Sequence, residues 1–325
     1  MSATCESVYA FDSVEKLQLL VERLNTWRCR YQVLGHGSNV LFTKHYHGCI
    51  LLNRIQGIKV LQETSESVSL DVGGGVNWHS LVIYALYRGW FGIENLISIP
   101  GTVGAAPIQN IGAYGTEVGE VLESCEALSL ATNRVHRFEH KDCQFGYRTS
   151  FFKRSAAEDD RFVVTSVRIR LRKKASINMV YPRLQNWIAR YYPNCPVTPY
   201  IVAKSVRALR MSRLPNWLEV GTVGSFFINP IVSHKKYQNL LSRWPQLDAL
   251  PLADGSIKLF AGNLLKLAGF SGFREGGLLM TSVNPMVVVN DSQADYQDLS
   301  RLREYVDKKM QTLFGITLVV EPKIF

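Results

Sequence analysis

Apolar positions recur along the chain at two spacings, one typical of helices and the other typical of strands. Residues 12–27 predict an amphipathic helix, with Asp12 as its N-cap, Glu15 three positions later, and an apolar stripe of Leu17, Leu20, Val21 and Leu24. From 162 to 171, apolar residues alternate with Arg168 and Arg170, which predicts a strand with one buried face. The chain therefore combines both kinds of element.

The same spacings locate the remaining elements. We expect helices at 77–89, with Asn77 as cap and Gly89 at the end, and at 199–211, 234–244, 257–268 and 296–313. Strand-like runs occupy 30–34, 39–42, 49–52, 58–62, 67–72, 286–289 and 316–321, and 125–171 is rich in strands. The looser stretch 173–199 predicts a loop or an insertion. Because this order follows no regular βαβ period, it favours an α+β fold over a doubly wound sheet.

Length and composition indicate a globular protein of two or three domains. The chain has 325 residues, of which 46% are hydrophobic, enough for several cores. The N-terminal residues lack the basic and apolar regions of a secretion signal, and no apolar run approaches the length of a membrane span. We therefore expect a cytoplasmic protein without a membrane anchor.

The formal net charge of +10 raises the question of a nucleic-acid partner. Lysine and arginine are dense only at 168–174 and 308–309, and no nucleic-acid-binding motif accompanies them. A basic surface suits polyanionic small molecules equally well, and we favour that explanation. The six cysteines form no C-x-x-C pair and no metal-ligand spacing with the seven histidines, which predicts reduced thiols and no metal site.

Glycine-rich segments stand out in the first third of the chain. Residues 99–115 contain four glycines and no charged residue, while Gly35-His36-Gly37-Ser38-Asn39 and Gly73-Gly74-Gly75 each follow a strand-like run. Glycine lets the backbone approach a ligand closely, so that successive N–H groups can bind an anion such as a pyrophosphate. A tight structural turn is the alternative for any one segment. Together the segments favour one long phosphate-bearing ligand held by several loops.

Residues 99–115 also resemble the flavin-binding signature of the UDP-N-acetylenolpyruvoylglucosamine reductase family, the MurB family of bacterial cell-wall synthesis. Four more motifs follow that family's pattern in the same order: 35–39, 145–150, 224–230 and Glu321-Pro322. The resemblance implies a PCMH/VAO-type FAD-binding fold of two α+β subdomains and a C-terminal α+β substrate-binding domain. The implied boundaries are 1–64, with the last strand in 314–325 returning to it, 65–212, with the insertion 173–199, and 213–313.

The resemblance further implies an oxidoreductase reaction. NADPH would reduce a non-covalently bound FAD, and hydride from flavin N5 would then reduce the enolpyruvyl ether of a UDP-N-acetylglucosamine derivative to UDP-N-acetylmuramate. The enzyme would act as a monomer on small-molecule substrates. Hydride addition to a double bond conjugated to a carboxylate needs donors directed at that carboxylate and an acid for the other carbon.

Three residues match the family's catalytic positions. Arg148 would bind the carboxylate, Glu321 would donate a hydrogen bond to the developing enolate if a buried site keeps it protonated, and Ser225 would protonate the carbon. The alternatives are a solvated arginine, an exposed strand-end carboxylate and a turn or cap hydroxyl. The family's motif usually has lysine where Ile228 stands, so the path of the proton stays open.

The resemblance also assigns binding residues. Those implied for FAD are Gly35, Gly37, Ser38, Asn39, Pro100, Gly101, Gly104, Asn110, Gly112 and Gly115, and those implied for the substrate are Tyr181, Arg213, Asn229 and Arg274. Loop packing is the alternative for Tyr181. His36 raises the possibility of a covalent histidyl flavin, which the resemblance disfavours. A flavin oxidase of the same fold acting on a small alcohol or sugar is the alternative function.

Overall fold

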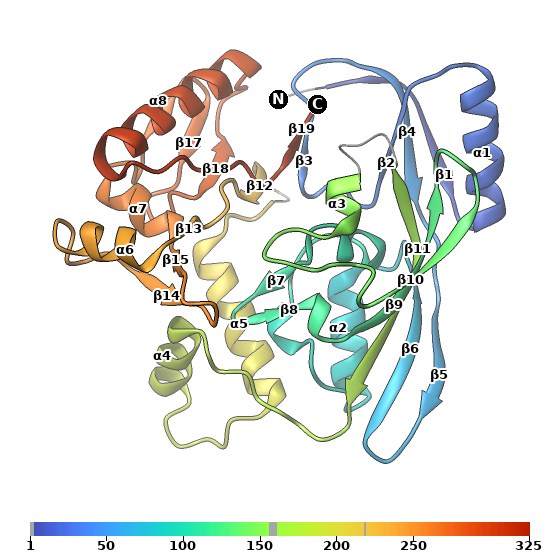
Figure 1. The fold of residues 1–325 in the computed structure, drawn as a ribbon, viewed down its shortest axis with the longest axis horizontal. Coiled ribbons are helices and arrows are strands. Elements are labelled where there is room, and N and C mark those ends of the chain that lie inside the picture. The colour runs from blue at the N-terminus through green and yellow to red at the C-terminus, as the bar shows by residue number, and fades with distance from the viewer. Residues whose placement is uncertain (1–2, 156–160, 218) are drawn as a thin grey trace. The chain divides into compact units, whose positions relative to one another are not determined.

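The computed structural model describes residues 3–155, 161–217 and 219–325 (Figure 1). Its helices are α1 (Val14–Thr26), α2 (Trp78–Tyr87), α3 (Phe151–Ser155), α4 (Pro182–Tyr191), α5 (Pro199–Arg213), α6 (His234–Leu241), α7 (Ala261–Leu267) and α8 (Tyr296–Phe314). The first strands are β1 (Cys5–Phe11), β2 (Tyr31–Leu34), β3 (Val40–Leu41), β4 (Tyr46–Asn53), β5 (Ile58–Glu63), β6 (Ser67–Gly73), β7 (Gly112–Ala113), β8 (Thr116–Glu117), β9 (Leu122–Ser129), β10 (Val135–Glu139) and β11 (Phe162–Arg172). The later strands are β12 (Gly221–Ser225), β13 (Ile231–Val232), β14 (Ala249–Pro251), β15 (Ile257–Leu259), β16 (Arg274–Glu275), β17 (Leu278–Met280), β18 (Val287–Asn290) and β19 (Lys323–Ile324).

The chain divides into two compact units, and this mixture of helices and strands is an α+β fold as the sequence predicts. The N-terminal unit comprises residues 5–38 and 47–210. The C-terminal unit comprises residues 39–46 and 211–325 together with the first described residues of the chain. The two units divide within α5, between Arg210 and Met211.

An antiparallel five-stranded sheet of order β10-β9-β11-β6-β5 forms the main layer of the N-terminal unit. In its central strand β11, Val167, Ile169 and Leu171 are fully buried and Arg170 is exposed, as the alternation predicts, while Arg168 is half-buried. Helix α2 contributes Leu81, Val82 and other side chains to the same core. Asn77 caps α2 as expected, accepting a bond from the Ser80 amide at 2.9 Å.

A smaller sheet of order β1-β4-β2 lies in the same unit and carries α1 (Figure 1). The apolar stripe of α1 is buried with residues of β2 and β4, including Tyr31 and Leu51. The N-cap of α1 is Ser13, which accepts from the Lys16 amide at 3.2 Å, so the expected cap Asp12 is wrong by one position. Aspartate and serine cap helices about equally well, and their order alone does not distinguish the two registers.

Helices α1 and α2 end in the same backbone motif with different residues in the left-handed position. In α1 the amides of Arg28 and Cys29 bond the carbonyls of Asn25 and Leu24, and Arg28 has φ 52°. In α2 the corresponding left-handed residue is Gly89, with φ 70°. This is the Schellman arrangement, in which glycine avoids the steric strain that a Cβ atom introduces.

These two ends give a matched stability prediction. Arg28→Gly should raise the free energy of unfolding by about 0.5–1 kcal/mol, because relief of left-handed strain outweighs the added freedom of the unfolded chain. Gly89→Ala should lower it by about 1 kcal/mol, although no atom beyond the adjoining residues lies within 4 Å of the new Cβ position. Thermal and urea unfolding measure both changes, and shifts of the same sign in the two variants would contradict the prediction.

The C-terminal unit is built around the antiparallel sheet β12-β18-β17-β16, with α8 packed on its β16 and β17 strands. The stripe predicted for α8 is buried at Leu299, Leu302, Val306 and Met310, with Phe314 in place of Leu313 as its last member. A second sheet, β13-β15-β14, packs beside α6 and α7. The short parallel pair β19-β3 joins residues 323–324 to 40–41.

Three expectations about element type are corrected. The predicted helix 257–268 begins only at Ala261, because residues 257–259 form β15. The predicted strand 316–321 has only an isolated bridge, Val320 with Phe227. The predicted loop or insertion 173–199 contains α4, which begins with Pro182 at its first position. None of the described helices is long and apolar enough to cross a membrane.

Candidate active site

The turn after β2 meets the glycine-rich stretch of the N-terminal unit. The Ser38 hydroxyl donates to the Pro100 carbonyl at 3.3 Å. A Cβ atom on Gly35 would lie 2.3 Å from the hydroxyl oxygen of the buried Thr102, and one on Gly101 would lie 3.2 Å from the Ser38 oxygen. Glycine at 35 and 101 is therefore required for the two segments to approach each other.

Backbone N–H groups of this turn are available to a ligand. Within the part of the chain that the structure describes, no protein acceptor takes up the amides of His36, Gly37 and Ser38. Gly37 has φ 70°, a backbone conformation that lets successive N–H groups converge on an anion. Burial, with a smaller contribution from Arg54, lowers the pKa of the His36 imidazole, which favours its neutral form. The turn is thus a candidate pyrophosphate cradle.

The other glycines of the first third mainly serve backbone packing. The amide of Gly104 donates to the Gly74 carbonyl at 2.9 Å, and that of Gly74 donates to the Thr165 carbonyl at 2.7 Å. A Cβ on Gly104 would lie 2.7 Å from the carbonyl oxygen of Val164. The run 73–75 is therefore not a third open ligand loop, because its backbone is in close contact with neighbouring strands and with Gly104.

Asn110 organises the second half of the glycine-rich stretch. Its side chain is buried, accepts from the Gly119 amide at 2.9 Å, and donates to the Glu117 carboxylate at 2.6 Å and the Gly146 carbonyl at 3.2 Å. Both ends of its amide are thus engaged within the protein. Asn110 itself has φ 48°, and Gly115 has φ 88°. The side chain fixes the path of residues 110–119.

Arg148 is brought to this same stretch. It stands in a tight turn, where Gly146 and Thr149 exchange backbone bonds of 3.0 and 3.1 Å, and it has φ 54°. Its guanidinium donates to the Gly112 carbonyl at 2.6 Å and lies 5.3 Å from the centre of the Tyr147 ring. The side chain is half-buried. The predicted catalytic arginine and the predicted flavin loop are therefore in contact.

Tyr181 reaches the same segment from the N-terminus of α4. Its ring packs edge-on against Tyr114 with 5.2 Å between ring centres and 76° between planes. The aromatic contact places the start of α4 over the stretch that contains Gly112 and Gly115. Residue Tyr181 is thus next to the predicted flavin loop.

Arg210 is a charged residue of this region that the sequence analysis does not identify. Its Nε donates to the Ser98 carbonyl at 3.2 Å, and among the described residues no ion pair joins it to a carboxylate. Burial lowers the pKa of its guanidinium; the nearby Tyr114 raises it and the like charge of Arg148 lowers it further. The sequence does contain an indication of this burial, because position 210 lies four and seven residues after the buried Val206 and Ala203, on the same face of α5.

The segments that carry Ser225 and Glu321 pair through their backbones within the C-terminal unit. The amide of Glu321 donates to the carbonyl of Phe226 at 2.9 Å, and that of Ile228 donates to the carbonyl of Val319 at 2.8 Å. These bonds place Glu321 opposite the residue that follows Ser225. Ser225 is half-buried after Gly224, which has φ 73°, and its hydroxyl has no hydrogen-bond partner among the described residues.

The remaining predicted substrate residues also lie in the C-terminal unit. Asn229 accepts from the amide of Ala261 at 2.9 Å and so satisfies the first turn of α7. Arg274 forms an exposed ion pair with Asp291. Arg213 is the last residue of α5, and Asn39 accepts from the amide of Lys323 at 3.1 Å. The structure therefore gives Asn229 and Arg274 roles in local structure.

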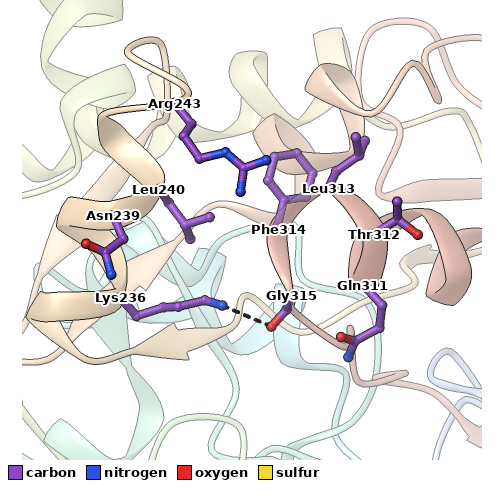
Figure 2. A pocket seen from close by; sticks show the side chains of 9 residues that line it. All are labelled: Lys236, Asn239, Leu240, Arg243, Gln311, Thr312, Leu313, Phe314 and Gly315. Carbon is purple, nitrogen blue, oxygen red and sulfur yellow. Dashed lines mark hydrogen bonds between the residues drawn. The ribbon is translucent and has the colours of Figure 1, made fainter.

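A pocket of about 360 Å³ lies between α6 and the end of α8 and contains none of these residues (Figure 2). Lys236 and Arg243 line it with Leu240 and Phe314, and the Lys236 ammonium donates to the Gly315 carbonyl at 3.3 Å. Gly315 ends α8 with φ 59°. A lysine on the last carbonyls of a helix is a common C-terminal cap, which accounts for Lys236 without a ligand.

Comparison with known proteins identifies both parts of the chain. Residues 6–139 match the model of an FAD binding domain, and residues 216–325 match that of the UDP-N-acetylenolpyruvoylglucosamine reductase C-terminal domain. The UDP-N-acetylenolpyruvoylglucosamine reductase of Polynucleobacter asymbioticus is 37% identical over 322 residues, covering 99% of this chain and 92% of its own length. That of Chromobacterium violaceum is 39% identical over 292 residues, covering 90% and 85%.

A solved structure supports the fold independently. The crystal structure of the MurB reductase from Thermus caldophilus superposes with a TM-score of 0.65 at 21% identity, covering 98% of this chain and 91% of that one. At this identity the likeness concerns the fold alone. The expected FAD-binding α+β architecture is thereby confirmed.

Proposed function

The chain belongs to the UDP-N-acetylenolpyruvoylglucosamine reductase family, and we propose that it reduces the enolpyruvyl ether of UDP-N-acetylglucosamine-enolpyruvate to UDP-N-acetylmuramate with NADPH. Membership makes it an FAD-dependent oxidoreductase of peptidoglycan precursor synthesis. The observation that best supports the proposed chemistry is the hydrogen bond that sets Glu321 opposite the residue after Ser225.

The residues present fit FAD. The amides of His36, Gly37 and Ser38 would bind its pyrophosphate, and the bond from Ser38 to Pro100 holds this turn against the loop that contains Gly101. The chemistry that FAD supplies when bound is hydride transfer, from NADPH and then to the substrate.

The protein's own residues would stabilise charge and supply the proton. Arg148 would bind the substrate carboxylate with its planar guanidinium, which presents paired donors that match the two carboxylate oxygens. Ser225 would protonate the carbon of the enolate, because its hydroxyl has no hydrogen-bond partner among the residues that the structure describes. Glu321, held beside that strand, would donate a hydrogen bond to the enolate in its protonated form.

Asn110 and Tyr181 both contact the predicted flavin loop, and we propose a different role for each. Since both ends of the Asn110 amide are engaged, we expect this residue to hold the flavin loop in shape and not to touch the cofactor with its side chain. Tyr181 would cover the diphosphate of the substrate from its position against Tyr114. Arg213 remains a proposed contact for the sugar nucleotide.

Arg210 would bind an anionic group of a ligand in this site, because a desolvated cation without a carboxylate partner is costly unless an anion arrives. Arg210→Met should leave the melting temperature unchanged or raise it. The same change should weaken ligand binding by roughly 10- to 150-fold, the equivalent of a charged hydrogen bond of about 1.5–3 kcal/mol. Flavin content and KM for the UDP-sugar measure the loss, and a variant with both unaltered would show that Arg210 binds no ligand.

A two-step absorbance experiment tests the proposed function. The purified protein should show a flavin spectrum, NADPH should bleach it without oxygen, and the enolpyruvyl UDP-sugar should restore it. Bleaching that this substrate does not reverse would refute the substrate assignment. Bleaching by an alcohol or sugar, with rapid recovery in oxygen, would instead indicate an oxidase of the same fold.

A further inference from the structure

Two cysteines of the N-terminal unit are in direct contact, although they are separated by twenty positions. The sulfur atoms of Cys29 and Cys49 lie 3.4 Å apart. A disulfide bond is about 2.05 Å long, so the two sulfurs need to approach by only about 1.4 Å. The proposed function uses neither residue.

The surrounding backbone holds this pair together. Cys29 follows the left-handed Arg28, and its own amide donates to the Leu24 carbonyl at 2.9 Å. The Cys49 amide donates to the Arg30 carbonyl at 2.8 Å, where β4 begins to pair with β2. A Cβ on Gly48 would lie 2.3 Å from the Arg30 carbonyl oxygen, so glycine permits this approach. The end of α1 and the pairing of β4 with β2 thus hold the two sulfurs in contact.

The environments of the two thiols differ. Cys29 is partly exposed, whereas Cys49 is buried with 5% of its surface accessible. Burial, assisted by the hydrogen bond with Cys29, raises the pKa of Cys49 to about 11. A thiolate is the attacking form of cysteine, so Cys29 is the thiol accessible for the first step and Cys49 the one placed for the second.

We propose that Cys29 and Cys49 form a reversible disulfide site, oxidised by a small-molecule disulfide such as glutathione disulfide. The Cys29 thiolate attacks one sulfur of that oxidant, forms a mixed disulfide, and releases one glutathione thiolate. Cys49 then loses its proton and attacks the Cys29 sulfur, which releases the second glutathione. The two protein thiols are oxidised, and the glutathione disulfide is reduced to two thiols.

The other cysteines provide internal controls. Cys125 and Cys143 also face each other, with 3.9 Å between their sulfurs, but both are buried and inaccessible to a reagent in the folded protein. Cys195 is exposed and, among the described residues, has no neighbouring thiol in hydrogen-bond contact. Cys5, on the strand next to β4, is the one further thiol whose charge affects Cys49. The proposal therefore predicts a different outcome of oxidation for these cysteines than for Cys29 and Cys49.

Peptide mapping of the holoenzyme without reductant tests the proposal. After incubation with glutathione disulfide and alkylation of the remaining thiols, Cys29 and Cys49 should be recovered as one linked peptide pair, and dithiothreitol should restore both alkylatable thiols. Because Arg28 and Arg30 flank Cys29, a protease other than trypsin is needed for the map. Cys195 should carry glutathione, and Cys125 and Cys143 should be alkylated only after unfolding.

Single substitutions distinguish a Cys29–Cys49 disulfide from a different cysteine pairing and from simple glutathionylation of Cys29. Cys29→Ser and Cys49→Ser should each abolish the linked peptide, and Cys29 should then accumulate glutathione in the Cys49→Ser variant. Cys5→Ser should leave the linked peptide unchanged. A Cys5–Cys49 link, or glutathione retained on Cys29 of the unsubstituted protein beside a free Cys49, would overturn the assignment.

Discussion

Alanine at position 225 is expected to slow reduction of the enolpyruvyl UDP-sugar by roughly 10²- to 10⁴-fold, the range typical of a lost general acid. Reduction of the flavin by NADPH should stay at its normal rate, because that half-reaction requires no proton on a substrate carbon. The hydroxyl of Ser225 has no protein partner in the described chain, so the substitution should not destabilise the fold.

Rapid-mixing absorbance separates the two half-reactions of this variant. Ser233→Ala provides the matched control, since Ser233 caps α6 by accepting from the Lys236 amide at 3.2 Å. That variant should lose about 1 kcal/mol of stability and keep its activity. If Ser225→Ala resembles it, with lower stability and an unchanged second half-reaction, then Ser225 is a turn hydroxyl and not the acid.

Lysine at position 148 is expected to lower the rate constant of the second half-reaction, reduction of the enolpyruvyl UDP-sugar, by about 10²- to 10³-fold. Lysine keeps the charge but loses the planar paired donors that match a carboxylate and that bond the Gly112 carbonyl. Both residues have a Cβ atom, so the left-handed backbone at 148 is equally strained in each and stability should change little.

Arg154→Lys is the control for this substitution, because Arg154 is an exposed arginine nearby that contacts Thr149 and Gln144. Steady-state and single-turnover rates for both variants, with melting temperatures, give the comparison. An Arg148→Lys enzyme with an unaltered second half-reaction would show that Arg148 only supports the loop. An effect confined to flavin content would lead to the same conclusion.

Local patterns predicted most elements of the fold because they depend on neighbouring residues. The stripe of α1, the Asn77 cap and the alternation along β11 each follow from a spacing that burial then satisfies. The prediction of a helix at residues 257–259 is wrong because Ile257 and Leu259 fit the apolar spacing of a helix as well as that of a strand. Only their pairing with β13 and β14 makes this segment a strand. The segment 316–321 was misassigned because an apolar run does not guarantee a ladder partner.

The candidate site was less accessible to sequence patterns, because partners distant in the chain determine what each polar group does. Neighbouring residues in the sequence do not show that the amide of Gly104 donates to the carbonyl of Gly74. Nor do they show that the side chain of Asn229 accepts a hydrogen bond from the first turn of α7. Conversely, the spacing of Arg210 from Val206 and Ala203 fits the buried face of α5, but the burial of its guanidinium follows only from the fold. Motifs predict which residues form the site, whereas the partner of each hydrogen bond follows only from the fold.

The pairing of β19 with β3 has a consequence for the order in which the molecule assembles. Thr43 donates to the carbonyl of Phe325, 282 positions further along the chain. At about 5–20 residues per second, a ribosome adds that stretch in roughly fifteen seconds to one minute. Residues 39–46 therefore leave the ribosome long before their partner exists, and closing so long a loop adds only a logarithmic entropy term. This corner of the protein should be among the last to become protected from amide exchange during synthesis.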